Sequence, residues 1–164
     1  MICLFAQLRR LRRDEDGSAL VEFGLILPMI LIVFAVTIEG SRLFWSYQAT
    51  IAGVRDAARY IGRSEQTDIC DTGGDLTGWS DTLTQIVRNT STGTPLFPAS
   101  ITINSVDATL ACVTGEFRLT TTPIVTVSAV LEITYPFQSI FEWSGVELPI
   151  TTTTITDSSR IFGA

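Results

Sequence analysis

A carboxylate stands inside the longest apolar run of the chain. Residues 19–38 carry one charged side chain, Glu22, about one helical turn into the run. On insertion scales a carboxylate costs about 2.5–3.5 kcal/mol at mid-membrane and less near the edge. Composition leaves two interpretations open: Glu22 reaches the interface and has no further role, or it pairs with a cation at its own depth. A cut after Gly17 would create such a cation, the amine of Ser18 on a neighbouring copy.

The cysteines suggest a second piece of chemistry. Of the three cysteines, Cys3 precedes the apolar run, whereas Cys70 and Cys112 both follow it and so share a compartment. In an oxidising compartment these two are expected to form a disulfide. The closed loop of about 42 residues would contribute at most roughly 4 kcal/mol on the chain-entropy model. The alternative is a pair of buried free thiols.

Catalytic and cofactor-binding patterns are missing from the sequence. The chain has no histidine, which excludes Ser-His-Asp and Cys-His arrangements. No phosphate-binding Gly-rich loop or Cys/His metal cluster is present, and the aspartates of residues 68–75 lack the ligand order of a calcium loop. The net charge of −6 argues against nucleic acid as a partner. We therefore expect no enzyme activity, no cofactor and no metal.

The apolar run predicts a membrane helix. Twenty helical residues span about 30 Å, the thickness of one hydrocarbon core. No convincing cut site follows the run, so we expect it to be retained as an anchor. Pro28 removes one helical hydrogen bond and is expected to kink the helix. Four arginines precede the run, at positions 9, 10, 12 and 13, and predict a cytoplasmic N-terminus with the C-terminal bulk outside.

The helix is expected to continue outward without a break. An amphipathic stripe recurs at helical spacing through residues 43–61, and Trp45 and Tyr47 lie where an interfacial aromatic belt is expected. Three arginines spaced by four share one edge, and they form either a solvated face or a surface for acidic neighbours in an assembly. The members of the stripe are Leu43, Tyr47, Ile51, Val54, Ala58 and Ile61, and the arginines are Arg55, Arg59 and Arg63.

The rest of the chain alternates between turn signals and strands. A polar loop over 64–78 and a short helix over 79–89 are followed by a linker to residue 100. Strand patterns occur at 101–103, 110–114, 124–135 and 149–156, with a loop or helical turn at 138–145. The prediction is an α+β fold, in which a long N-terminal helix packs on a small antiparallel sheet of three or four strands, with a short extra helix.

Several stretches resemble one protein family. Gly17-Ser18-Ala19-Leu20-Val21-Glu22-Phe23, behind a basic leader and opening an apolar helix, resembles the processing site of type IV prepilins. The longer stretch 13–28 resembles the TadE-like minor pilins, or pseudopilins, of the tight-adherence (Tad or Flp) pilus. Residues 38–43, 57–60 and 134–137 are similar to that family as well. The resemblance is dense over 13–63 and loose beyond.

The resemblance implies specific roles. A prepilin peptidase would cut between Gly17 and Ser18 and methylate the new amine, and Glu22 followed by Phe23 would form the assembly and recognition element. The implied partners are the peptidase, other minor pilins, the major Flp-type pilin, the inner-membrane assembly platform and the lipid bilayer. The implied function is support of pilus assembly for surface adherence. The outer domain is larger than the major pilin, which favours a minor subunit.

These expectations divide the chain into four parts. Residues 1–17 form a cytoplasmic leader that is removed, 18–41 a transmembrane helix in the inner membrane, 42–63 a helical spine, and 64–164 a periplasmic domain. Two rivals remain open. One is an uncleaved single-pass protein whose outer domain binds a ligand or an envelope partner. The other is a Tad relative that stays in the membrane as an unprocessed scaffold.

Overall fold

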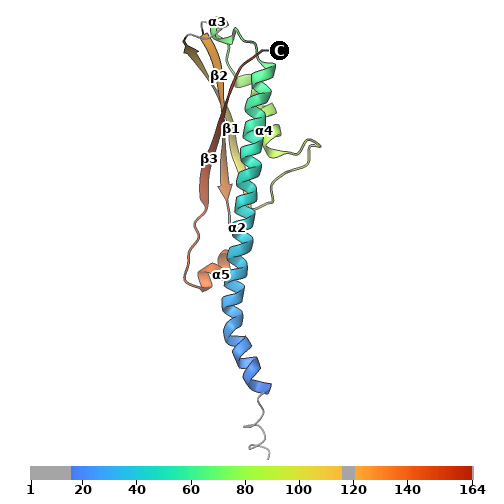
Figure 1. The fold of residues 1–164 in the computed structure, drawn as a ribbon, viewed down its shortest axis with the longest axis vertical. Helices are drawn as coiled ribbons and strands as arrows, with labels where there is room; N and C mark the ends of the chain where they lie inside the picture. Colours follow the sequence, from blue (N-terminus) through green and yellow to red (C-terminus); the bar gives the residue numbers. More distant parts are fainter. Residues whose placement is uncertain (1–15, 116–120, 164) are drawn as a thin grey trace, which may run out of the picture.

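One helix, α2 (Asp16–Ser64), runs through almost the whole length of the molecule (Figure 1). The computed structural model describes residues 16–115 and 121–163, so the arginine cluster and Cys3 lie outside the described residues. The helix continues through Pro28 and joins the two helical stretches that the sequence predicted. The other elements are α3 (Ile69–Thr72), η1 (Thr77–Trp79), α4 (Ser80–Arg88), β1 (Ile101–Thr114), β2 (Thr121–Ile133), α5 (Gln138–Trp143) and β3 (Thr151–Arg160).

The three strands form one antiparallel sheet in the order β1-β2-β3. Ile101 pairs with Ile133 at one end of the β1–β2 ladder, and Ile124 pairs with Arg160 at one end of the β2–β3 ladder. The central strand, β2, alternates strictly, because every second side chain points into the core. Its buried apolar side chains are Val125, Val127, Ala129, Leu131 and Ile133.

The fold has two layers. The outer half of α2 packs on β2 and β3, α4 packs on β1, and the two helices also contact each other. A single core cluster therefore joins the helices to one face of the sheet. Antiparallel sheets commonly leave their second face to solvent. The predicted α+β arrangement is confirmed, with three strands.

The buried face of α2 differs in part from the predicted stripe. Val54, Ala58 and Ile61 are fully buried, as predicted, whereas the lower members of the stripe are only half-buried. In that part the fully buried side chains are Ser46 and Thr50. Each hydroxyl donates to the carbonyl four residues earlier, at 2.8 Å, and so needs no outside partner. The stripe was wrong there because it counted only large apolar residues.

Two other segments correct the sequence prediction. The predicted polar loop over 64–78 contains α3 and η1, and it buries Ile69 and Leu76 in the core. The strand patterns at 101–103 and 110–114 are the two ends of one strand of 14 residues, β1. Polar and half-buried residues between them hid the continuity, because no single face of that stretch is uniformly apolar.

Gly62 marks the closest approach between α2 and the end of β3. Its carbonyl accepts a hydrogen bond from the Phe162 N–H at 2.8 Å. A Cβ at position 62 would lie 2.8 Å from the Arg160 carbonyl oxygen and 2.9 Å from Ser159 Oγ. The end of β3 can therefore reach the helix only where the helix has no side chain.

We expect Gly62→Ala to lower the free energy of unfolding of the outer domain by about 1–3 kcal/mol, because backbone atoms would have to move. Gly40→Ala is the matched control, since a Cβ there meets nothing within 4 Å and alanine favours a helix. The measurement is denaturant unfolding of the full chain in detergent. Equal stability of the two variants would show that β3 does not close against α2 as described.

Candidate functional site

The predicted processing and assembly residues occupy the first turns of α2. Gly17, Ser18, Glu22 and Phe23 are all exposed on the helix surface. Ser18 and Glu22 are four residues apart and so lie on the same side of the helix. A Cβ on Gly17 would meet nothing within 4 Å, so packing within the subunit does not require glycine there. The structure leaves this end of the helix open to partners outside the subunit.

Glu22 has no partner among the residues that the structure describes. In the part of the chain that the structure describes, its carboxylate makes no hydrogen bond or ion pair, and its neighbours on the helix are exposed apolar side chains. A charge in such a surrounding requires either water or a cation supplied from elsewhere. The pairing of Glu22 with a neighbour's amine remains a prediction, and so does the kink at Pro28.

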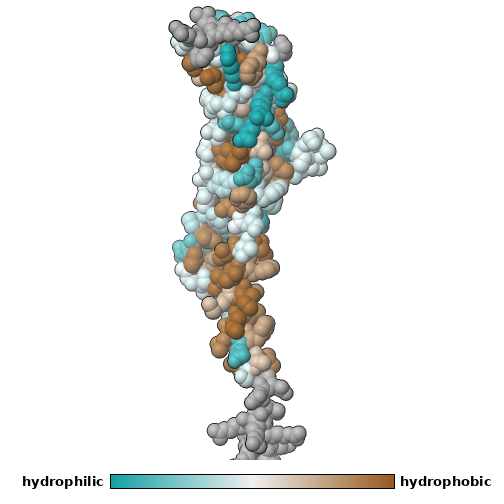
Figure 2. Space-filling view, in the orientation of Figure 1, coloured by the Kyte–Doolittle hydropathy of each residue, from teal (hydrophilic) through white to brown (hydrophobic). Residues whose placement is uncertain are grey.

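The exposed apolar side chains of residues 19–38 cover the lower half of α2, and we call this surface the apolar collar. The helix includes a window of 18 residues apolar enough to cross a membrane, of which 6% is buried in the subunit. Figure 2 shows hydrophobic colour over this part of the molecule and paler or hydrophilic colour over most of the sheet domain. A helix whose large apolar side chains face outward on all sides fits a single-pass membrane protein.

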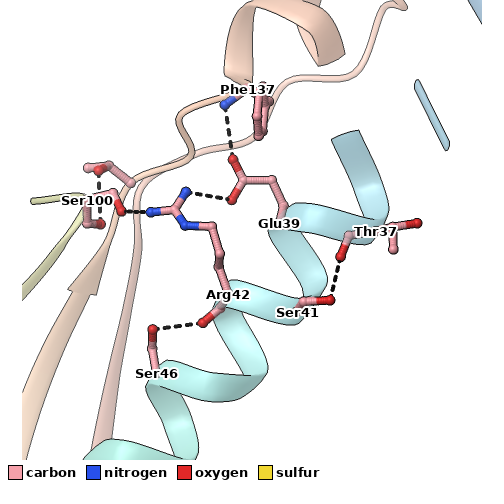
Figure 3. A network of polar contacts seen from close by, with 8 residues as sticks. Thr37, Glu39, Ser41, Arg42, Ser46, Ser100 and Phe137 are labelled. Carbon is pink, nitrogen blue, oxygen red and sulfur yellow. Dashed lines mark hydrogen bonds and ion pairs between the residues drawn. The ribbon is translucent and has the colours of Figure 1, made fainter. Parts of the chain in front are cut away.

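A polar network lies where α2 leaves this collar (Figure 3). Glu39 is 9% exposed, and its Oε1 accepts a hydrogen bond from the Phe137 backbone N–H at 3.0 Å. Its Oε2 lies 3.5 Å from Arg42 Nη1. Arg42 in turn donates through Nη2 to the hydroxyl of Ser100. One carboxylate and one guanidinium thus tie α2 to the start of α5 and to the residue before β1.

The same junction is closed by a backbone contact. The Ser100 carbonyl accepts hydrogen bonds from the Thr134 N–H at 2.9 Å and from the Thr134 hydroxyl at 3.0 Å. Residues 38–43 and 134–137, two of the stretches that resembled the pilin family, therefore meet here. We call this group of Glu39, Arg42, Ser100, Thr134 and Phe137 the exit clamp.

Sequence reasoning missed the function of the exit clamp. Glu39 and Arg42 were quoted only as family-like residues. Their spacing of three places both on one side of the helix, and Glu39 is the first charge after the apolar run. That signal could have identified Glu39 as a residue needing a partner. The partner itself, a backbone N–H 98 residues away, has no signature in the sequence.

The remaining predicted residues lie at the far end of the rod. A disulfide joins Cys70, in α3, to Cys112, in β1. Nearby, the hydroxyl and then the backbone N–H of Thr77 donate to Asp75 and hold the pKa of that carboxyl below its ordinary value. Asp75 thus shapes a turn. No group of three potential metal ligands occurs among residues 16–115 and 121–163.

The arginine edge of α2 is only partly committed within the subunit. Arg55 lies 3.4 Å from Asp157 of β3, with both side chains well exposed. An exposed pair of this kind contributes about 0–1 kcal/mol. Arg63 donates to the Arg59 carbonyl at 3.3 Å, and both side chains face solvent. The edge therefore offers positive charge on the surface of an acidic subunit.

We expect Glu39→Ala to loosen α5 without unfolding the sheet. The variant removes a charged hydrogen bond, worth about 1.5–3 kcal/mol, and leaves Arg42 without its carboxylate. Amide exchange should become about tenfold faster or more in residues 137–143, while β2 keeps its protection. Ser41→Ala is the control, because the Ser41 hydroxyl bonds only to the Thr37 carbonyl of its own helix. Unchanged exchange in Glu39→Ala would remove the exit clamp as a structural element.

Comparison with known proteins links this helix to a family. Residues 17–59 match the model of a family described as TadE-like protein. No curated protein and no solved structure matches the chain. The match begins at Gly17 and extends past the exit clamp residues of α2, and it leaves the sheet domain outside. Over residues 17–59 the chain is therefore similar to TadE-like proteins.

Proposed function

We propose that this chain is a minor pilin that supports assembly of a Tad-type pilus for surface adherence. The observation that carries the proposal is the TadE-like match beginning at Gly17. The matched segment begins at a Gly-Ser boundary and contains a carboxylate in an apolar helix, and the outer domain follows it in the order that a processed pilin needs. The exposure of Gly17, Ser18 and Glu22 supports the proposal, because a peptidase and a neighbouring subunit both require access.

The proposed orientation places the N-terminus in the cytoplasm and the sheet domain in the periplasm. The four arginines before the apolar run favour this topology, since such residues stay on the cytoplasmic side. The disulfide between Cys70 and Cys112 supports it, because disulfides persist in the oxidising periplasm. The subunit would then be anchored in the inner membrane by residues 18–41.

The proposed partners follow from the exposed helix. A prepilin peptidase would bind the segment around Gly17, and other minor pilins, the major Flp-type pilin and the assembly platform would meet the apolar collar. Removal of residues 1–17 would take away four arginines and three acidic residues and leave 7 basic and 14 acidic side chains. That acidic subunit would be repelled by nucleic acid and needs no cofactor for the proposed role.

Processing is tested by Gly17→Ala. We expect the wild-type protein, purified from peptidase-competent cells, to begin at Ser18, and the variant to keep residue 1, because the peptidase requires glycine before the cut. Gly24→Ala is the matched control. It changes another exposed glycine of the same helix, and neither added Cβ meets an atom within 4 Å. The measurement is intact-protein mass spectrometry.

Two outcomes would favour the rival interpretations. An intact Met1 in the wild-type protein points to an uncleaved single-pass protein whose outer domain binds an envelope partner. Normal pilus formation with Gly17→Ala points to a Tad relative that acts in the membrane as an unprocessed scaffold.

Assembly is tested by Glu22→Ala. We expect the variant to be cut at Gly17 as before but to fail to support pilus formation, because no carboxylate remains to pair with a neighbour's Ser18 amine. Electron microscopy of cell-surface pili, together with mass spectrometry of the subunit, separates the two effects. Glu22→Asp keeps the charge on a shorter side chain and should support part of the piliation. Normal piliation by Glu22→Ala would exclude the pairing.

A further inference from the structure

A short apolar segment hangs below the sheet and runs beside α2 (Figure 1). It consists of α5 and the residues that lead to β3, 138–150, and we call it the foot. Three large apolar side chains of the foot are strongly exposed, Trp143 at 70%, Ile150 at 62% and Val146 at 48%. Phe141, by contrast, is buried at 7% and holds the turn of the foot together. A tryptophan this exposed has no packing role inside the subunit.

The foot lies beside the apolar collar. A groove of about 360 Å³ separates the two, with Leu27, Pro28 and Leu31 of α2 on one wall and Ile140 and Trp143 of α5 on the other. Pro28 precedes Ile38, the last residue of the apolar run, by about 15 Å of helix. Half of a hydrocarbon core is about 15 Å thick. The foot is thus well below the level at which the apolar run ends.

We propose that the foot enters the outer leaflet of the membrane and that a lipid chain fills its groove. The inference rests on the proposed function only in requiring that α2 be a membrane anchor. The foot continues the lipid-facing surface, because one wall of its groove is made by residues of the apolar run itself. Placing it in water would expose Trp143, Val146 and Ile150 at once, whereas lipid buries all three.

The charges of the foot set its depth. Glu142 and Glu147 are both exposed, and Glu142 accepts a hydrogen bond from the Gln138 amide at 2.7 Å. Carboxylates are costly at mid-membrane but tolerated at the headgroup level, where tryptophan is also enriched. The foot therefore sits at the interface, and the outer hydrocarbon boundary dips towards Pro28 on this side of α2. A local thinning of this kind is a known response to charged side chains placed below the headgroups.

The lipid is recognised by its apolar chains and not by an anionic headgroup. Residues 138–150 include no arginine or lysine, so the foot itself offers no cation to a phosphate group. The exit clamp fixes the foot from above, because Glu39 holds the N–H of Phe137 just before α5 begins. The foot consequently moves with α2 and is placed in the leaflet whenever the anchor is.

Tryptophan fluorescence tests this placement, since the chain has three tryptophans. The full chain is reconstituted in phosphatidylcholine vesicles with bromine either near the top or near the end of the acyl chains. Trp45→Phe/Trp79→Phe leaves Trp143 as the reporter. Trp45→Phe/Trp143→Phe leaves Trp79, which packs edge-to-face against Tyr60 and donates to Glu65 far from the collar. A third variant carries Phe34→Trp, Trp45→Phe and Trp143→Phe. Its new tryptophan reports on the membrane anchor, and Trp79 is kept as the reference.

We expect shallow bromine to quench Trp143 several-fold more than Trp79, and more than deep bromine does. If the variant with Trp143 alone does not fold by circular dichroism, the difference between Trp45→Phe and Trp45→Phe/Trp143→Phe gives the same quantity. If Trp143 is quenched no more than Trp79 while the Phe34→Trp reporter is quenched, the foot does not enter the leaflet. The membrane anchor would remain supported by that result.

Three further results also overturn the proposal. Stronger quenching of Trp143 by deep bromine would contradict the interfacial depth. Protection of Trp143 from both bromine and acrylamide would mean that a second copy covers the foot. No quenching of the Phe34→Trp reporter would remove the membrane anchor, and with it the orientation proposed for the whole subunit.

Discussion

The structure depends on one helix that has to satisfy two surroundings in succession. Its lower half exposes large apolar side chains except on the side that α5 covers, whereas its upper half must let a twisted sheet approach closely. Small residues make the second task possible. A Cβ on Gly53 would lie 3.1 Å from the Val87 Cα of α4, and Gly62 leaves still less room beside β3. With Ala57 and Ala58 fully buried between them, the helix brings its backbone to the sheet and α4 instead of holding them off with long side chains.

The change from one surrounding to the other takes place at Glu39. Below it, apart from Glu22, the helix presents apolar side chains that lipid can solvate, and above it the hydroxyls of Ser46 and Thr50 turn back onto the helix. Glu39 and Arg42 face the sheet domain at this boundary and bond to groups from two distant parts of the chain. Breaking such a partly buried pair on one side is costly, because the remaining charge keeps part of its desolvation penalty. Glu39 and Arg42 therefore hold the sheet domain against α2 at the level between the apolar run and the hydrophobic core.

Periodicity made most of the elements predictable. The alternation of β2 and the helical spacing of Val54, Ala58 and Ile61 each record a face that is buried, so the α+β fold could be read from the residues. The buried hydroxyls of Ser46 and Thr50 carry no such record, because they satisfy themselves within the helix. The contact between Glu39 and Phe137 is also hidden, since a backbone N–H has no identity in the sequence. The position of α5 along α2 was hidden as well. No feature of residues 138–143 predicts that α5 lies beside Pro28 and not beside the sheet.

The position of α5 constrains how helices of neighbouring subunits can pack. At the level of Leu27 and Leu31 one side of α2 faces the groove of the foot, so a second helix must approach from another side. Nearer the N-terminus, around Glu22, the structure places no element beside the helix, and all sides are open among the residues it describes. Among the described residues, close helix contact is therefore least restricted at the depth of Glu22, where the predicted pairing with a neighbour's amine would take place. The most accessible part of the described helix is thus the part around Glu22, where the carboxylate would favour a neighbour that carries a cation.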